Sequence, residues 1–201
     1  MAAFQSPSAR VVSLPNDLRS PDSAAFIHAW NLWRGDRLLP SRRDFDLGSI
    51  KRLLPRVILL ELRSQTEVAF RLAGTWITRV LGVELTGRNY LELGNPADRK
   101  ERADLLFAEV AQPCGAVMIY PMQYASGRAA PVEVISAPVV GDDPADPPLV
   151  FALLTELTSN NFAEPLAPDL ARQLPTGRQL RFFDIGAGTP DIPPYAPRPA
   201  A

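Results

Sequence analysis

Histidine and cysteine, two side chains typical of metal sites and nucleophilic catalysis, are scarce in this 201-residue sequence. The chain has one histidine, His28, and one cysteine, Cys114. His28 stands beside Phe26 and Ile27 in an apolar stretch, which favours a surface or packing role over a catalytic one. With one residue of each type, neither a histidine metal cluster nor a Cys–His catalytic pair is indicated. We therefore expect no metal site.

Two charged residues, Arg71 and Glu133, stand in the middle of apolar stretches. An isolated charge inside an apolar layer is costly, so such residues are normally exposed or paired. We expect both to lie on the solvent face or in a cross-strand ion pair; the alternative is that Arg71 meets an anionic group of a ligand. An enzyme would have to rest on Arg71, Glu133 and Tyr90 as acid–base groups, and we expect no catalytic activity.

The composition is that of an ordinary globular protein with one folded domain, since 46% of the residues are hydrophobic and 21% are charged. A net charge of -1 gives no field that would attract nucleic acid. No apolar run approaches the ~20 residues of a membrane helix, and the N-terminus lacks the pattern of a secretory signal. We expect a cytoplasmic protein that neither binds nucleic acid nor inserts into a membrane.

Two helices are predicted in the first quarter of the chain. Between Ser23 and Arg34 the apolar residues recur every three or four positions, which predicts an amphipathic helix that packs on the sheet or on a partner. Gly35 ends this helix. A second helix is predicted over residues 47–54, with Asp46 as its cap.

The remaining pattern predicts strands and short helices. Strands are expected over residues 57–62, 68–73, 116–124, 131–140 and 149–157. After the second strand the period becomes helical, with Thr75 as a cap and Gly82 as the stop. A turn at 86–89 and a helix over 95–110 follow. Two strands, a helical stretch and three strands indicate an α+β fold with an antiparallel sheet.

The ends of the chain lack a regular pattern and are rich in proline. We divide the chain into a flexible arm over 1–22 with at most a short strand at 10–14, a folded domain over 23–157, a C-terminal extension over 158–185 and a Pro-rich disordered tail over 186–201. Within the extension, a short helix at 169–174 and a strand or docking segment at 179–185 are predicted.

The order of elements from Val68 to Leu93, a strand, a short helix, a glycine turn and another short helix, resembles the middle of a PAS domain. The preceding part of the chain is similar to the leading segment of a stand-alone bacterial PAS family, formerly a domain of unknown function. This similarity is carried by Trp30, Arg34-Gly35, Leu39-Pro40-Ser41-Arg42 and Asp44-Phe45-Asp46. The resemblance covers roughly residues 24–157. It implies a five-stranded antiparallel sheet with short helices on one face, preceded by the amphipathic helix.

Within this resemblance, Gly87-Arg88-Asn89-Tyr90 is similar to the flavin photoreceptors of the family, in which Gly-Arg-Asn is followed by the cysteine that attacks flavin. Tyr90 takes the place of that cysteine here, and a phenol cannot form the adduct. We expect these residues to form a turn with a positive φ and a helix cap, while flavin binding without the adduct stays an alternative. Heme binding is another alternative, with His28 as the iron ligand. His28 is poorly placed for this role, because it lies in the helix before the core, whereas heme ligands in such domains usually come from the central helices. We expect that no cofactor is required.

The resemblance also implies a small cavity between the sheet and the central helices. The residues expected to line it are Phe70, Arg71, Leu72, Trp76, Tyr90, Met118 or Ile119, Tyr120, Glu133, and Ile135 or Val134. A register error of one residue would reverse every one of these faces.

The resemblance implies a non-catalytic sensory or adaptor module of bacterial signal transduction that contacts a signalling partner, under the control of a small ligand. We expect a homodimer, with Phe26, Trp30 and Trp33 of the first helix at the interface, because aromatic residues dominate interface energetics. The alternative is a receptor for heme, flavin or a metabolite, whose cavity is the main function. A solid interior would favour the adaptor, and a bound molecule would favour the receptor.

Overall fold

The computed structural model describes residues 15–16, 18–158 and 180–192. The expectations for a strand at 10–14 and a helix at 169–174, and most of those for the arm and the tail, lie outside the described residues. Residues 186–192 form neither a helix nor a strand.

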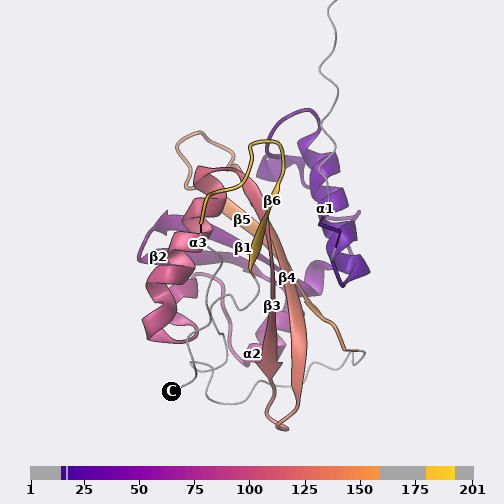
Figure 1. The fold of residues 1–201 in the computed structure, drawn as a ribbon, viewed down its shortest axis with the longest axis vertical. Helices are drawn as coiled ribbons and strands as arrows, with labels where there is room; N and C mark the ends of the chain where they lie inside the picture. The colour runs from indigo at the N-terminus through magenta and orange to yellow at the C-terminus, as the bar shows by residue number, and fades with distance from the viewer. Residues whose placement is uncertain (1–14, 17, 159–179, 193–201) are drawn as a thin grey trace, which may run out of the picture.

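The centre of the molecule is one antiparallel sheet in the order β2-β1-β5-β4-β3-β6 (Figure 1). Its strands are β1 (Val57–Ser64), β2 (Glu67–Ala73), β3 (Cys114–Gln123), β4 (Ala129–Val139), β5 (Leu149–Glu156) and β6 (Arg181–Asp184). The first five confirm the strands predicted from alternating apolar residues. The sixth is the strand expected within 179–185, and it extends the sheet beyond the five strands that the resemblance implied.

A close approach of backbone and ring attaches β6 to the edge of the sheet. Gly115 pairs with Phe183, and a Cβ on Gly115 would lie only 2.0 Å from a ring atom of Phe183. Only glycine therefore leaves room for this ring on the face of β3. The neighbouring Phe182 points to the opposite face, where it lines a cavity.

Helices cover both faces of the sheet, and Figure 1 shows α1 (Pro21–Arg34) on one side and α3 (Arg99–Ala111) on the other. The helix α2 (Thr75–Leu81) and the 3₁₀ helix η3 (Tyr90–Glu92) lie on the same side as α3. The expected grouping on one face is thus right for the central helices. The first helix covers the other face because its apolar side chains pack on β4 and β5.

The predicted helix over 47–54 is wrong. The chain forms consecutive turns there and then a 3₁₀ helix, η2 (Leu54–Arg56). Asp46 still acts as a cap, because its Oδ1 accepts a hydrogen bond from Gly48 N at 3.0 Å. Gly48 and Ser49 are poor helix formers, which explains why the segment does not continue as an α-helix.

Two other helix starts differ in detail from the prediction. Gly74, and not Thr75, is the N-cap of α2, and a Cβ on Gly74 would lie 2.3 Å from the carbonyl oxygen of Pro55. The helix predicted over 95–110 begins with a 3₁₀ turn, η4 (Pro96–Asp98), in which Asn95 caps Ala97 N at 3.0 Å as expected. The helix α3 then follows.

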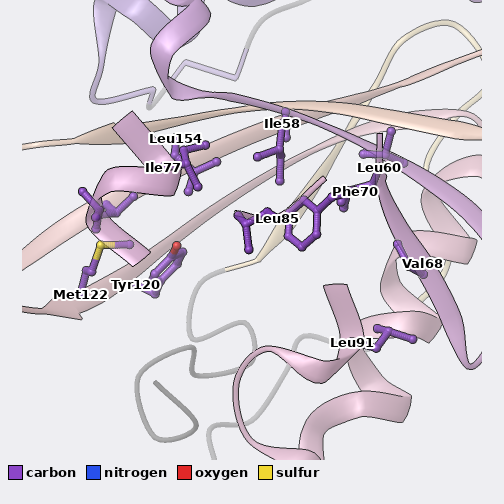
Figure 2. Packing of buried hydrophobic residues seen from close by; sticks show 14 of the residues in the cluster. Ile58, Leu60, Val68, Phe70, Ile77, Leu85, Leu91, Tyr120, Met122 and Leu154 are labelled. Carbon is purple, nitrogen blue, oxygen red and sulfur yellow. The ribbon is translucent and has the colours of Figure 1, made fainter. Parts of the chain in front are cut away.

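Strand alternation creates two apolar layers. In β1, Ile58 and Leu60 face α2 and α3, whereas Val57 and Leu59 face α1. Figure 2 shows the first of these layers, including Ile58, Phe70, Ile77 and Tyr120. The central strands are therefore buried on both faces, and the two layers can be compared directly.

Candidate functional site

A cavity of about 140 Å³ lies in the layer between the sheet and the central helices. Every strand of the sheet contributes to its lining, as do α2, η3 and α3. The apolar lining includes Ile58, Leu60, Phe70, Trp76, Ile77, Val80, Leu93, Leu105, Leu106, Ala116, Met118, Met122, Val134, Val150, Ala152, Leu154 and Phe182. Such a site suits an apolar molecule that is fixed by a few polar groups.

The ionisable Arg and Glu side chains of the cavity lining both lie on α3. Arg102 and Glu109 both line the cavity, and they lie seven residues apart, which places them on the same face of the helix two turns from each other. Arg102 is 6% exposed and Glu109 is 2% exposed. Helix α3 thus places two ionisable groups against an apolar layer.

Arg102 is incompletely paired. Its Nη2 donates to the carbonyl oxygen of Leu91 at 2.9 Å, and its guanidinium carbon lies 5.4 Å from the ring centroid of Tyr90. Its Nε and Nη1 atoms are buried and have no hydrogen-bond partner among the residues that the structure describes. Unpartnered buried donors of a charged group are expensive, so this arginine favours an added acceptor.

Glu109, an acidic residue, is also buried and incompletely hydrogen-bonded. Its Oε2 accepts a hydrogen bond from Ser136 Oγ at 3.0 Å, whereas Oε1 has no partner within the described segments. Burial raises the pKa of Glu109 to about 8. The carboxyl group is therefore mostly protonated at neutral pH and can donate a hydrogen bond into the cavity.

Two tyrosines and Ser136 are the other polar residues of the lining. Burial raises the pKa of the Tyr90 phenol, with Arg102 acting in the opposite direction, and burial also raises the pKa of Tyr120. Both phenols stay neutral at physiological pH. They can serve as hydrogen-bonding groups but are poorly suited as bases.

The structure places five of the predicted pocket residues in the cavity wall and four outside it. Phe70, Trp76, Tyr90, Met118 and Tyr120 line the cavity, together with Val134, the alternative to Ile135. Arg71, Leu72, Glu133 and Ile135 do not line it.

Leu72 lies outside because the pairing of β1 with β2 is irregular, and Arg71 lies outside because it directly follows the inward-facing Phe70. Leu60 pairs with Phe70 and Leu59 with Leu72, so Arg71 is an extra residue at a bulge. The Arg71 Nε lies 3.2 Å from Glu61 Oε2, which is the cross-strand ion pair expected as the simpler alternative, and Leu72 is 39% exposed.

Glu133 lies on the opposite face from the cavity and is fully buried, at 0% exposure. Its carboxylate accepts hydrogen bonds from Arg19 N at 2.7 Å, Ser20 N at 3.1 Å and Ser23 Oγ at 2.6 Å. The expectation of a solvent position or an ion pair is therefore wrong. The positive N-terminal end of α1 compensates this charge, and the neighbouring Ile135 faces α1 as well.

The three expected interface residues are also buried inside the chain. Phe26 packs on Phe151 with ring centroids 4.9 Å apart, and Trp33 lies 6.1 Å from the same ring. The Trp30 indole donates to the carbonyl oxygen of Pro138 at 3.1 Å. Because these aromatic rings form the core under α1, they are not the exposed contact surface that we expected.

The Gly87-Arg88-Asn89 segment is the turn and cap predicted for it. Gly87 has a φ of 81°, and the Asn89 side chain accepts from Leu91 N at 3.1 Å and from Val68 N at 3.1 Å. These bonds tie the start of η3 to β2 and so fix Tyr90 beside the cavity.

The sequence analysis did not identify Arg102 as a cavity residue. The signal that could have found it was its position three and four residues before the inward-facing Leu105 and Leu106.

The residues present fit neither a flavin adduct nor a heme. A cavity of about 140 Å³ is smaller than the roughly 300–1,000 Å³ of pockets that hold larger ligands. Cys114 is buried away from the cavity wall, and burial raises the pKa of its thiol to about 12. His28 is exposed on α1, across the sheet from the cavity.

The described part of the chain offers little for other kinds of site. No group of three or more His, Cys, Asp or Glu side chains there could hold a metal ion. None of the helices in these segments has the length and apolar character needed to cross a bilayer. The suggested acid–base set of Arg71, Glu133 and Tyr90 is spread over three separate environments and does not form one site.

Several solved structures are similar to part of this chain. The PAS domain of a protein from Colwellia psychrerythraea shares 12% identity over 57% of this chain and 98% of that chain, with a TM-score of 0.40. A Rhodobacter sphaeroides LOV protein shares 15% identity over 60% of this chain and 73% of that chain, with a TM-score of 0.39. VqmA bound to DPO shares 15% identity over 57% of both chains, with a TM-score of 0.42.

No curated protein matched the sequence. The family model described as "PAS domain" matches residues 18–155, which includes α1, the central helices, strands β1 to β4 and all of β5 except Glu156. Because this match spans well over half of the sequence, the chain belongs to the PAS domain family.

Proposed function

We propose that this PAS chain is a non-catalytic sensory module that binds a small ligand in its cavity and passes the occupancy of that cavity to a signalling partner. The observation that carries the proposal is the cavity itself, because it holds unpartnered polar atoms of Arg102 and Glu109. A group that served only for stability would gain from being paired or replaced by an apolar side chain. A cavity with such groups supports the ligand-responsive alternative over a solid adaptor.

Trp76 offers a route from the cavity to the surface. It lines the cavity and also an outer groove, which is formed by the start of α1, by η2 with Arg56 and by the end of β5 with Glu156. In that groove Arg56 pairs with Asp22 of α1 at 2.7 Å. A ligand that displaces the indole would therefore alter a charged surface of the molecule.

A partner contact through α1 has to use the outer side of the helix, because its aromatic side is occupied. Leu32 lies on that outer side and is 64% exposed. Homodimerisation and a cytoplasmic location stay predictions from the sequence.

The test is native mass spectrometry of the freshly purified full chain, together with an absorption spectrum. We expect a bound small molecule that is released on denaturation, and no heme or flavin absorption. Ala152→Leu fills part of the cavity and should lose the molecule, whereas Ala25→Leu, on the exposed side of α1, should retain it. The proposal is wrong if the chain carries no molecule and no small probe raises its thermal midpoint.

A further inference from the structure

We infer that the ligand of this cavity is a small monocarboxylate with an apolar body of one ring or a short chain, whose anionic group is bound by Arg102 of α3. The inference rests on the proposed function and names the chemical class of its ligand. It is carried by the state of Arg102, by the chemistry at the other end of α3 and by the size of the cavity.

Two buried arginines differ in how completely they are hydrogen-bonded. Arg34 is 5% exposed, and its guanidinium donates to Asn31 Oδ1 at 2.7 Å and to the carbonyl oxygens of Arg37 and Ile185, both at 3.2 Å. Arg102 is as deeply buried but leaves Nε and Nη1 without a partner among the described residues. An arginine remains charged at any physiological pH, so the missing partner at Arg102 has to be an acceptor, and a carboxylate is the strongest one.

The two ionisable groups of α3 give the cavity one charged end and one mostly neutral end. Glu109 lies about 10.5 Å from Arg102 along the helix axis, at a rise of about 1.5 Å per residue. Its carboxyl group is mostly neutral at pH 7, so it does not repel an anion in the same cavity. It can instead bind a hydroxyl or carbonyl group at the other end of the ligand. A cationic ligand would face the charge of Arg102 without an anionic partner at Glu109.

The volume of the cavity limits the size of its ligand. A cavity of about 140 Å³ is close to the roughly 150 Å³ apolar cavity that accepts benzene. Phe70, Leu106 and Ile58 provide apolar surface for such a body. Carboxylates with a single ring or a short chain therefore fit, whereas multi-ring cofactors do not.

The experiment measures binding to the full chain by calorimetry with two matched pairs of probes, phenylacetate with phenylacetamide and hexanoate with hexanamide. Each pair has nearly the same shape and differs in charge. At least one carboxylate should bind about tenfold or more tightly than its amide, because a hydrogen bond to a charged group contributes more than a neutral one. Arg102→Met should remove this preference, and Arg102→Lys should keep part of it.

Arg99→Met is the matched control, since Arg99 lies on the exposed side of the same helix. It should leave the preference unchanged. If Arg102→Met does not fold, the comparison of each acid with its amide on the unmodified chain still decides the question.

The inference is overturned if each amide binds as tightly as its acid, or if Arg102→Met keeps the full preference. It is also overturned if toluene binds but neither carboxylate does; the cavity then retains its proposed role with a neutral ligand. If toluene, the acids and the amides all fail to bind, the inference is overturned, and the proposed function fails with it when the purified chain also carries no molecule.

Discussion

The two faces of the sheet are built from similar apolar residues but differ in how completely they are packed. Under α1 the rings are in continuous contact, with Phe45 5.0 Å from Phe151 and 4.6 Å from Trp33. Under α2 and α3 the same strands border a cavity. Three buried polar atoms without a partner among the described residues, on Arg102 and Glu109, belong to this second face.

The two buried glutamates show the same difference. Glu133 under α1 accepts three hydrogen bonds, whereas Glu109 beside the cavity accepts one among the described residues and keeps one oxygen unpartnered. A charge that the fold fully compensates serves stability. A polar group that the fold leaves incomplete is suited to binding. The α1 face is therefore the better packed of the two, and the other face is the one for which we propose ligand recognition.

The largest expected effect separates two buried phenylalanines. Phe151→Ala should lower the free energy of unfolding by about 3–5 kcal/mol, because its ring contacts three other rings in a filled layer. Phe70→Ala should cost less, since Phe70 already borders empty space and loses fewer contacts. Urea unfolding of both variants measures the difference. Equal losses would contradict the contrast between the faces.

The two glutamates should respond in opposite directions to the same substitution. Glu133→Gln weakens bonds made to a charged carboxylate, and we expect a loss of about 1.5–3 kcal/mol at pH 7. Glu109→Gln removes an ionisable group whose pKa is raised by burial to about 8, and it should stabilise the protein at alkaline pH.

The contribution of Glu109 to the free energy of unfolding changes with pH, because its pKa differs between the folded and the unfolded chain. Below its unfolded pKa of 4.5 the carboxyl group is protonated in both states and has no pH-dependent effect. Between pH 4.5 and about 8 the unfolded chain ionises while the folded chain does not, so the wild type loses stability as the pH rises, by at most about 1.4 kcal/mol per pH unit. Urea midpoints of wild type and Glu109→Gln should coincide near pH 4 and diverge towards pH 8. Parallel profiles would show that Glu109 is not buried as described.

Alanines on the two faces give a smaller effect. Ala137 lies in the filled layer and Ala152 in the cavity wall. Ala137→Leu should destabilise by about 1–3 kcal/mol through overpacking, whereas Ala152→Leu should be nearly neutral because its added carbons enter the cavity. Thermal unfolding of the two variants provides the measurement. A comparable loss for Ala152→Leu would indicate that the cavity cannot accept added volume.

The strands and central helices could be predicted because each has its own local pattern, such as the change of period near Gly74 and the Asn89 cap. The direction of single side chains could not. Leu72 leaves the expected face at a bulge, which depends on how β1 pairs with β2. Glu133 finds its partners more than 100 residues earlier in the chain, and no local pattern indicates that contact.

The smallest expected effect concerns Arg71, whose side chain is 45% exposed and shares Glu61 with Arg63. Arg71→Met should change the free energy of unfolding by about 1 kcal/mol or less, because exposed ion pairs contribute little and Arg63 still holds Glu61 at 2.6 Å. It should also leave the binding of phenylacetate and hexanoate unchanged, whereas Arg102→Met should not. Calorimetry on the two variants compares Arg71, which the sequence offered as an alternative anion contact, with Arg102 in the cavity wall. A loss of carboxylate binding in Arg71→Met alone would place the anion at the bulge of β2 and not under α3.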